Sequence, residues 1–407
     1  MPRRRCCNDG NVSDPHSDIL SRESMIYIRS RAYYSRRCKK EMPTNIESLP
    51  TDLLFDILLR LPANHLYERA RLVCRRWYHI IHSHAFINAQ MHGATYGLLL
   101  WPLNKTTLPL YVTADAEGGI HIYELTYIFK LGVLATCNGL VLELEDTCFR
   151  LPRLVIVNPA TMKSLFLPPF PRGVRYRLFF SSLAYSAASL AYKVIAPYTV
   201  RDCAPYTFPD WPLRLDPDYG LDVLTVGIDE SWRHVGVHHL PDHVRRFVFD
   251  KAPLTSEGFL HWGRGKCCAT LDVETEIITL SEAPYEYNEC DYYYLSTGRC
   301  VSLLVACGDL SWEVWEMKAE TGEWRKALPN VDLGAEKYRI RQFSYRALEP
   351  LGWVKYPQVL AFYFGNYYSE KPKCHCIFYN LDTHQLGPIE LPQSYARPHK
   401  NNLTWLS

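Results

Sequence analysis

Cysteine and histidine side chains, which can bind metal ions, stand close together at two places in the C-terminal half of the sequence. Cys374, His375 and Cys376 are consecutive, and Cys267 and Cys268 are adjacent. Both runs read as strands, in which neighbouring side chains point to opposite faces, so neither run can readily direct all of its ligands at one ion. The chain also contains no CxxC pair and no HExxH motif. We therefore predict no metal site and interpret these cysteines as structural.

A third group consists of four histidines in the run RHVGVHHLPDH, which begins at Arg233. On a strand, His234 and His238 would share a face, which permits a pair of metal ligands in principle. Neutral histidines in a loop are the commoner outcome. We interpret all four, including His239 and His243, in this way.

Motifs for covalent or phosphate chemistry are also missing from the sequence. There is no GxSxG nucleophile elbow, no GxxxxGK[ST] phosphate loop and no GxGxxG dinucleotide fingerprint. The run GRGKCC, from Gly263, is too short for a phosphate loop and sits inside an expected hairpin. We therefore predict a protein that is not an enzyme, that uses no cofactor and that acts by binding.

Composition narrows the classes of partner and the cellular location. A formal net charge of +2, with 22% charged residues, gives no global field that would favour nucleic acid or a membrane surface. No run of about eighteen apolar residues occurs, and the start MPRRRCCNDG lacks the apolar segment of a secretory signal. We expect a cytosolic or nuclear protein whose 14 cysteines are reduced. Residues 1–42 read as a mostly disordered basic tail, in which the cluster at 36–40 either serves nuclear import or is a solvated charge run.

The elements that would carry a binding function begin at residues 49–86, where apolar side chains recur at helical spacing. The first stripe consists of Leu53, Ile57, Leu58 and Leu61. The second consists of Leu66, Ala70, Val73, Trp77 and Ile80 or Ile81. Pro62 should end the first helix, and Asn64 is a suitable N-cap for the second. Two helices this small bury little apolar surface by themselves, so we expect them to dock on another protein.

This stretch resembles the F-box from end to end, through LP at Leu49, LL and IL in the first helix, RLP at its end, and VCRRW in the second. Ala70 departs slightly, because many relatives carry a larger or polar residue there. The resemblance implies an adaptor of a cullin-based ubiquitin ligase that docks on a Skp-type linker subunit. The residues expected to face the linker are Leu49, Pro50, Leu53, Ile57, Leu58, Leu61, Pro62, Leu66, Val73, Cys74 and Trp77. The residues alone leave another interpretation open, a helical hairpin packed on its neighbouring domain.

From Leu98 onward the sequence consists of short apolar or alternating runs, such as GLLLW, RLVIVN and SWEVWEMK, separated by Gly, Pro, Asn and Asp. These features are typical of strands. Helical patterns of ten or more residues are absent between them, which argues against a parallel βαβ architecture. We therefore predict an all-β domain built from antiparallel sheet.

A hairpin pattern recurs within these strands, each copy with an acidic or amide residue and Thr or Ser in its turn. Its markers are Asn158, Asp229, Asp272, Glu320 and Asp382, at intervals of 71, 43, 48 and 62 residues. The longer intervals leave room for insertions such as the Pro-rich stretch at 197–217. At about 45 residues per blade, residues 98–407 make roughly seven units, or six with insertions. We predict a β-propeller of six or seven blades, closed by placing residues 98–101 near the C-terminal strands.

The phrases ATCNGLVLEL, IVNPATMKSLFLP, ESWRHV and GFLHWG occur in the order found in the F-box-associated domain of plant-type F-box proteins. The resemblance implies a kelch-like propeller across about two thirds of the chain. The pairs Asn138-Gly139 and Asn158-Pro159 are typical of turns, and Gly139 can adopt a positive φ without steric cost. The run LAYSAASLAYKV departs, because Ala and Ser replace the acidic or polar turn of relatives. The surface chemistry of that turn therefore stays open.

Two loops are richer in aromatic residues than a solvated turn requires, and they are our candidates for target binding. Tyr and Trp give large contact areas at low entropic cost. Packing of these rings over blade edges is an equally good interpretation. The candidate residues are Trp211, Tyr219, Tyr285, Tyr287 and Tyr292.

Together these features predict a small all-α F-box domain at 43–90, a linker or third short helix at 87–97, and a propeller at 98–407. The expected function is that of a substrate-recognition adaptor in an SCF-type ubiquitin ligase, with a Skp-type linker, a cullin and an unknown protein target as partners. Two alternatives remain: a propeller that binds a small molecule or glycan, and an F-box scaffold that works outside any ligase.

Overall fold

A computed structural model describes residues 49–406, except 103–106, 131, 146–152, 172–174, 177–179, 201–217, 285–290, 309, 339, 341–347, 366–373 and 392–393. The expected basic tail therefore lies outside the described residues. By its contacts the chain divides into two compact units, Met1–Ile57 and Leu58–Ser407. None of the helices described in these residues is both long enough and apolar enough to cross a membrane.

The N-terminal part of the described chain is helical, as predicted. Pro62 has φ −57° and ψ 145°, an extended conformation that separates the first helix from the next. The helical elements are α2 (Thr51–Leu59), α3 (Ala63–Glu68), the 3₁₀ turn η2 (Ala70–Leu72), α4 (Arg75–Ile81) and α5 (His84–Gly93). The helix α5 realises the third short helix, and Ser83 caps it by accepting a hydrogen bond from the Phe86 amide at 3.2 Å.

Two details of the predicted helices are wrong. The second stripe is not one helix, because Cys74 is extended, with φ −160° and ψ 169°, and so separates η2 from α4. Asn64 does not cap α3: it is buried inside that helix, while Pro62 holds the N-cap position without a side-chain cap. Apolar spacing could not reveal the interruption, because Val73 and Trp77 keep helical spacing on either side of the extended residue.

The rest of the described chain forms six antiparallel sheets, which settles the blade number at six. Five blades are each built from consecutive strands. The first comprises β4 (Gly132–Cys137), β5 (Leu140–Glu145), β6 (Arg153–Asn158) and β7 (Lys163–Phe166), and the second comprises β8 (Arg175–Tyr176), β9 (Ser182–Ser186), β10 (Ala191–Val200), β11 (Asp218–Thr225) and β12 (Arg233–Val235). The third comprises β13 (Leu254–Ser256), β14 (Phe259–Arg264), β15 (Cys267–Asp272) and β16 (Ile278–Glu282), and the fourth comprises β17 (Tyr292–Ser296), β18 (Val301–Gly308), β19 (Ser311–Lys318) and β20 (Glu323–Asp332). The fifth comprises β21 (Glu349–Lys355), β22 (Val359–Gly365), β23 (Cys374–Asn380) and β24 (Gln385–Leu391). The sixth joins both ends of the domain: it comprises β25 (Ser394–Lys400) with β1 (Tyr96–Pro102), β2 (Leu110–Ala114) and β3 (Ile120–Glu124).

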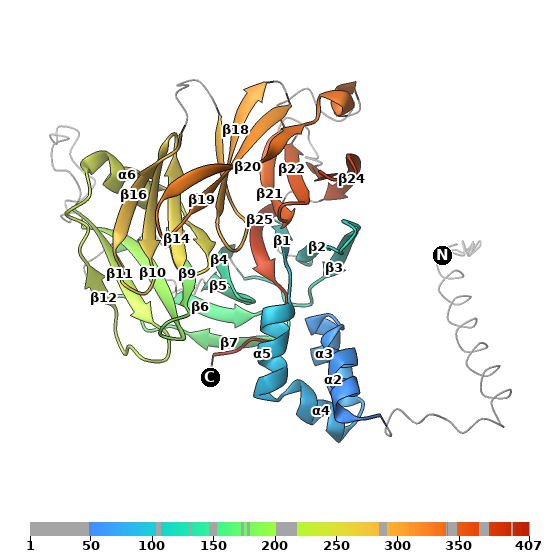
Figure 1. Cartoon of the computed structure of the whole chain (residues 1–407). Coiled ribbons are helices and arrows are strands. Elements are labelled where there is room, and N and C mark those ends of the chain that lie inside the picture. The colour runs from blue at the N-terminus through green and yellow to red at the C-terminus, as the bar shows by residue number, and fades with distance from the viewer. Residues whose placement is uncertain are drawn as a thin grey trace, which may run out of the picture. The chain divides into compact units, whose positions relative to one another are not determined.

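The ring closes as predicted, through a blade shared by the two ends of the domain. β25 pairs antiparallel with β1 (Figure 1). Leu98 lies opposite Pro398, and Trp101 lies opposite Tyr395. The first strands of the six sheets, β25, β4, β9, β13, β17 and β21, contact one another in turn around the ring. These six inner strands therefore surround the central channel.

The repeated hairpin pattern marks the same position in each blade where it occurs. Each of its five markers lies in the turn between the third and fourth strands of a different blade, at the end of β6, β11, β15, β19 or β23. The sixth blade has an equivalent turn at 115–119, which the sequence pattern missed. There Asp115 Oδ1 accepts hydrogen bonds from the amides of Glu117 at 3.0 Å and Gly119 at 2.7 Å. The turn chemistry is thus common to all six outer hairpins.

The apolar core lies between neighbouring blades. One cluster joins residues of β10 and β11 to Leu260 and Trp262 of β14, and another joins Leu98 and Val112 to Phe378 of β23. A nine-residue helix that the sequence did not reveal, α6 (Asp242–Asp250), adds Val244 and Val248 to the first cluster. Stacking of the blades therefore covers both faces of each sheet, as a ring requires.

One polar side chain is held inside this core. His261 of β14 is fully buried, with Nε2 2.7 Å from Ser256 Oγ and Nδ1 3.0 Å from Thr270 Oγ1. Burial removes hydration from the charged imidazolium and lowers the pKa of His261 to about 3. The folded protein therefore keeps this ring neutral at pH values where the unfolded chain protonates it.

This histidine should make the free energy of unfolding depend on pH. Its folded pKa lies below the ordinary value of 6.5, so the unfolded state binds the proton first and stability is lost as pH falls below about 6.5. The contribution is up to about 1.4 kcal/mol per pH unit. We expect His261→Gln to flatten the slope of unfolding free energy against pH between about 6.5 and 4.5, measured by urea denaturation. His239→Gln, which changes an exposed ring, is the matched control; an equal slope in the two variants would contradict this account.

Candidate functional site

The first helix presents two of the predicted linker-facing residues to solvent. Leu53 and Ile57 of α2 are 52% and 47% exposed, and their spacing of four places them on one helical face. Pro50 is also exposed, while Leu49 is partly buried. Two large aliphatic side chains on one exposed face are available to a partner.

The other predicted linker-facing residues fall into three groups by their exposure. Val73 is 61% exposed, as is its neighbour Leu72 at 70%, which the sequence did not single out. Leu58 and Leu66, in contrast, are fully buried and stabilise the helices themselves. The remaining four are partly buried: Leu61, Pro62, Cys74 and Trp77. The exposed members are therefore the sharper candidates for contact with a linker.

The aromatic candidates for target binding are only partly described. Trp211, Tyr285 and Tyr287 lie outside the described residues, and Tyr219 is in β11. Tyr292 of β17 is half-buried and packs on a cluster of blade residues. That cluster consists of Ala283, Leu303 and Val305. Packing over the blade thus accounts for Tyr292, and target binding by these residues stays a prediction.

The paired cysteines point to different sides of their strand. Cys267 of β15 packs against the cluster that contains Leu260, whereas Cys268 is buried with Val301 and Met317. In β23, Cys376 is buried among residues that include Phe378. No group of three His, Cys, Asp or Glu side chains within the described residues is placed to hold a metal ion.

The histidine run does not form one loop. His234 belongs to β12, where its Nδ1 lies 2.7 Å from the Tyr198 hydroxyl, and His243 lies in α6. His238 and His239 lie between these two elements and are exposed. The interpretation as loop residues is therefore right for His238 and His239 and wrong for the other two.

A cavity of about 490 Å³ opens at the end of the central channel, a size typical of small-ligand sites. Five of the six inner strands line it, together with the hairpin turns that follow them. The turn after β9, whose chemistry the sequence left open, contributes Ala187 and Ala188, which are exposed. The apolar part of the lining also includes Ala135, Pro253, Leu254, Phe259 and Pro398. We call this cavity the channel mouth.

Three basic side chains of the channel mouth come from β25. Arg397, His399 and Lys400 all line the cavity. The Lys400 ammonium lies 4.4 Å from the centre of the Tyr96 ring, and burial lowers the pKa of Lys400. His399 is 2% exposed, and burial lowers its pKa to about 3, so its ring is neutral at physiological pH.

The geometry of the turns around the cavity is fixed. Gly298, in the turn after β17, has φ +89° and packs against Tyr96, where a Cβ atom would lie 2.4 Å from the ring. Asn138 and Gly139, after β4, both have positive φ, at 47° and 86°, as the predicted turn chemistry requires. These turn conformations therefore place Asn138 and Gly298 in the lining of the cavity.

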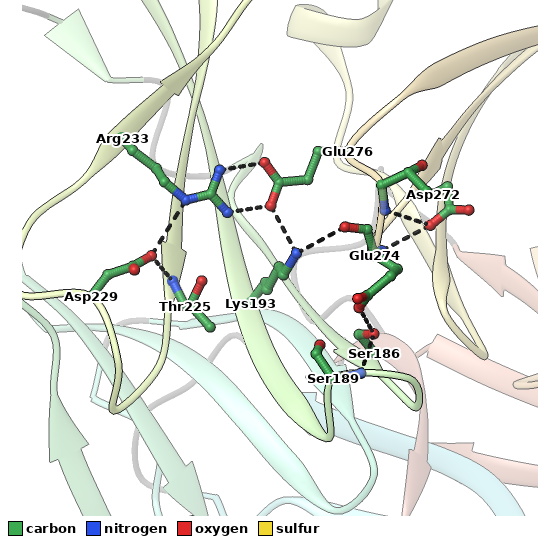
Figure 2. A network of polar contacts seen from close by, with 10 residues as sticks. Ser186, Ser189, Lys193, Thr225, Asp229, Arg233, Asp272, Glu274 and Glu276 are labelled. Atoms are coloured by element: carbon green, nitrogen blue, oxygen red, sulfur yellow. Dashed lines mark hydrogen bonds and ion pairs between the residues drawn. The ribbon is translucent and has the colours of Figure 1, made fainter.

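A polar network ties the wall of the cavity to the two neighbouring blades β8–β12 and β13–β16 (Figure 2). Glu276 accepts a bidentate ion pair from Arg233 and a second from Lys193 Nζ at 2.8 Å. Lys193 also donates to the Glu274 carbonyl at 3.3 Å, and the Glu274 carboxylate accepts a hydrogen bond from Ser186. Because Ser186 and Glu274 line the cavity, the network orients part of its wall.

The network should also stabilise the ring. Burial acts to raise the pKa of Glu276, but the hydrogen bonds and charges of Arg233 and Lys193 outweigh it and hold this pKa below its ordinary value. We expect Glu276→Gln to lower the free energy of unfolding by about 2–3 kcal/mol at pH 7, because it leaves two partly buried cations underpaired. The difference from the native chain should shrink as pH falls below about 4.5, where the unfolded carboxylate takes up a proton.

Chemical denaturation at pH 7 and at pH 4 measures both effects. Glu117→Gln, at an exposed position in the turn 115–119, makes the same chemical change outside the network and is the matched control. Equal stabilities of the two variants at pH 7 would show that the network does not hold the blades together.

Sequence reasoning missed the three basic residues of the channel mouth. Their strand reads SYARPHK, which combines three basic groups with a proline and lacks the apolar alternation of a half-buried strand. One signal was available: ring closure requires a C-terminal strand to pair with β1, and this is the last run of the chain long enough to do so.

Comparison with known proteins agrees with the helical part of the fold. The F-box domain profile matches residues 46–88. In Arabidopsis thaliana, F-box protein CPR1 is 31% identical over 36% of this chain and 37% of its own length, and putative F-box/kelch-repeat protein At3g17280 is 28% identical over 32% and 34%. The chain thus spans about a third of the length of these two relatives. Probable F-box protein At5g47300 of the same plant is 23% identical over 74% of this chain and 72% of its own.

Among solved structures, TolB from Acinetobacter baumannii covers 80% of this chain and 73% of its own at 9% identity, with a TM-score of 0.37. The F-box match and the six sheets of the structure together give a short helical F-box region followed by a six-blade antiparallel propeller. A kelch-like character of the blades remains a prediction.

Proposed function

We propose that this chain, which carries an F-box domain at residues 46–88, is the substrate adaptor of an SCF-type ubiquitin ligase. The observation that carries the proposal is the joining of that domain to a six-blade propeller in one chain. In this function the F-box docks on a Skp-type linker subunit, the propeller holds the target protein, and the linker connects both to a cullin. The chain itself makes and breaks no bonds. The proposal places the protein in the cytosol, the nucleus or both.

The physical contribution of such an adaptor is effective concentration. A target held on the propeller meets the conjugating enzyme within one assembly, so a bimolecular encounter becomes intramolecular. The exposed aliphatic side chains Leu53, Ile57 and Val73 support the docking step, because their contact with a linker would remove apolar surface from water.

Reconstitution tests this proposal. The full chain is mixed with a purified Skp-type linker and then with a cullin, and the mass of each complex is measured by size-exclusion chromatography with light scattering. We expect a 1:1 complex with the linker and a ternary complex after addition of the cullin. Binding to the linker without a cullin would favour the scaffold function outside a ligase. Absence of linker binding would contradict the proposal.

A further inference from the structure

The three most exposed aliphatic side chains in the described part of the propeller lie in hairpin turns. Leu190, Ile228 and Ile277 are 75%, 70% and 57% exposed. Leu190 ends the turn 187–190 between β9 and β10, Ile228 lies in the turn 226–232 between β11 and β12, and Ile277 ends the turn 273–277 between β15 and β16. A single exposed aliphatic residue is ordinary, whereas a group of them marks an interaction site.

The polar network of Figure 2 joins these three turns. Each exposed aliphatic residue is next in sequence to a network member, and these members are Ser189, Asp229 and Glu276. Arg233 donates to Glu276, and its Nε lies 3.5 Å from Asp229 Oδ2. The Ser189 amide donates to Ser186 Oγ at 3.4 Å, and the Ser186 hydroxyl donates to the Glu274 carboxylate. The turns of two blades are therefore held together, and their aliphatic side chains with them.

The sheet register brings two of the three side chains to the same place. β10 and β11 pair antiparallel, with Lys193 opposite Thr225. Three residues beyond this pair, the same register puts Leu190 opposite Ile228. The two most exposed aliphatic side chains of the propeller therefore extend from the same end of neighbouring strands.

Leu190 is unusual in its backbone as well as in its exposure. Its φ is +53°, in the left-handed region that favours Gly and Asn over a bulky side chain. Ala187 and Ala188 of the same turn are exposed too, so this turn presents a largely apolar surface. Stability of the free chain does not account for leucine here, because both solvent and backbone favour other residues.

The charge of the three turns is negative. They contain no Lys or Arg, and their acidic residues are Asp229, Glu230, Glu274 and Glu276. The two cations of the network, Lys193 and Arg233, come from the adjoining strands and both bind Glu276. Four carboxylates and two cations leave a net charge of −2. Glu230 and Glu274 are exposed, and they direct this charge to solvent beside the aliphatic residues.

From this arrangement we infer that the three turns form a docking surface for a protein segment that carries aliphatic side chains next to Lys or Arg. The aliphatic groups of the segment would cover Leu190, Ile228 and Ile277, which removes apolar surface from water on both sides. Its basic groups would face Glu230 and Glu274. Because the network already orders the turns, docking costs little conformational entropy on this side of the contact.

The charge of the surface also decides against a second copy of this chain as the occupant. A two-fold contact places the same patch on both sides, so Glu230 and Glu274 would face their own copies. Assignment of the docked segment to a ubiquitination target rests on the proposed adaptor function. The binding chemistry itself does not depend on that function.

The first test uses the full chain and three libraries of fluorescein-labelled, C-amidated dodecapeptides. One library combines Leu and Ile with Lys, the second has Glu in place of every Lys, and the third has Ser in place of every Leu and Ile. Binding is measured by fluorescence anisotropy. We expect the first library to bind at least about tenfold more tightly than either of the others and to weaken between about 50 and 500 mM NaCl. Equal affinities for the three libraries would overturn the inference.

A triple variant tests whether these side chains form the surface. Leu190→Asn, Ile228→Thr and Ile277→Thr together should weaken binding of the first library at least about tenfold. The variant should melt at a temperature equal to or above that of the native chain, because Asn adopts positive φ more readily than Leu and the other two changes are at exposed positions. This combination of a stable fold with lost binding separates a docking role from a structural one.

The control is the Ile122→Thr, Ile128→Thr double variant, which changes two exposed isoleucines outside the three turns and should keep native affinity. Native affinity in the triple variant would contradict the inference. So would a dimer of the native chain, seen by light scattering, that the triple variant loses, because the surface would then serve self-association. Linker binding measured on the same samples keeps a failure here distinct from a failure of the adaptor function.

Discussion

Replacing Leu53 and Ile57 together by aspartate is expected to weaken binding of a Skp-type linker subunit at least about 100-fold. Both side chains are about half exposed on one face of α2, so the free chain should tolerate the change. In a complex their burial would contribute about 1.5–3 kcal/mol each, and burying a carboxylate there instead costs several kcal/mol. Together these terms exceed the 2.8 kcal/mol or so that a 100-fold loss requires.

Two comparisons make this result specific. Ile228→Asp changes an exposed aliphatic side chain in the turn between β11 and β12 and should leave linker affinity unchanged. Leu58→Asp would be a poor test, because Leu58 is fully buried and its loss would disrupt the helices themselves. Affinity is measured by isothermal titration, with circular dichroism to establish folding. Retention of nearly native affinity by the double variant would place the linker elsewhere.

Asn158→Asp is expected to lower the free energy of unfolding by about 3–5 kcal/mol. Asn158 is fully buried at the end of β6, where its Nδ2 donates to the carbonyls of Asn402 at 3.0 Å and Thr404 at 2.6 Å. Its Oδ1 accepts from the amides of Ala160 at 2.8 Å and Thr161 at 3.1 Å. Aspartate keeps the accepting role but turns a carboxylate oxygen toward two carbonyl oxygens, which leaves all three without a donor.

The control for this substitution lies in another blade. Asn380 also accepts from two turn amides, those of Asp382 at 2.9 Å and Thr383 at 3.1 Å, and within the described residues it donates to no carbonyl. We therefore expect Asn380→Asp to cost less than about 1 kcal/mol. Urea denaturation measures both variants. Similar losses of unfolding free energy at the two positions would show that the hydrogen bonds from Asn158 to the Asn402 and Thr404 carbonyls contribute nothing to stability.

The architecture could be predicted largely because its signals are local. Helical spacing at residues 53–61, a proline at 62 and turn residues at fixed places in each outer hairpin follow from backbone geometry alone. Ring closure followed from the need to cover both faces of every blade. These features depend on residues that are close together in sequence or on a repeated pattern, so a single sequence is enough to predict them.

The channel mouth could not be predicted, because its residues meet only through the ring. Thr136 of β4 donates to the Pro398 carbonyl of β25, a contact between residues 262 positions apart. Two of the inner strands, β25 and β9, also carry small or polar residues in place of a clear apolar alternation. The break at Cys74 was missed for a related reason, since one extended residue leaves the apolar spacing intact.

The most direct test of the adaptor function measures binding of the ligase subunits and binding of target proteins in one experiment. The tagged chain and its Leu53→Asp, Ile57→Asp double variant are expressed in cells and purified with and without proteasome inhibition, and the proteins that accompany them are quantified by mass spectrometry. We predict that the native chain captures a Skp-type linker, a cullin and a set of proteins that increases when the proteasome is inhibited. The double variant should lose the linker and the cullin and retain that set without the inhibitor. Capture of neither ligase subunit by the native chain, or a set of captured proteins that responds neither to the inhibitor nor to the double substitution, would contradict the account.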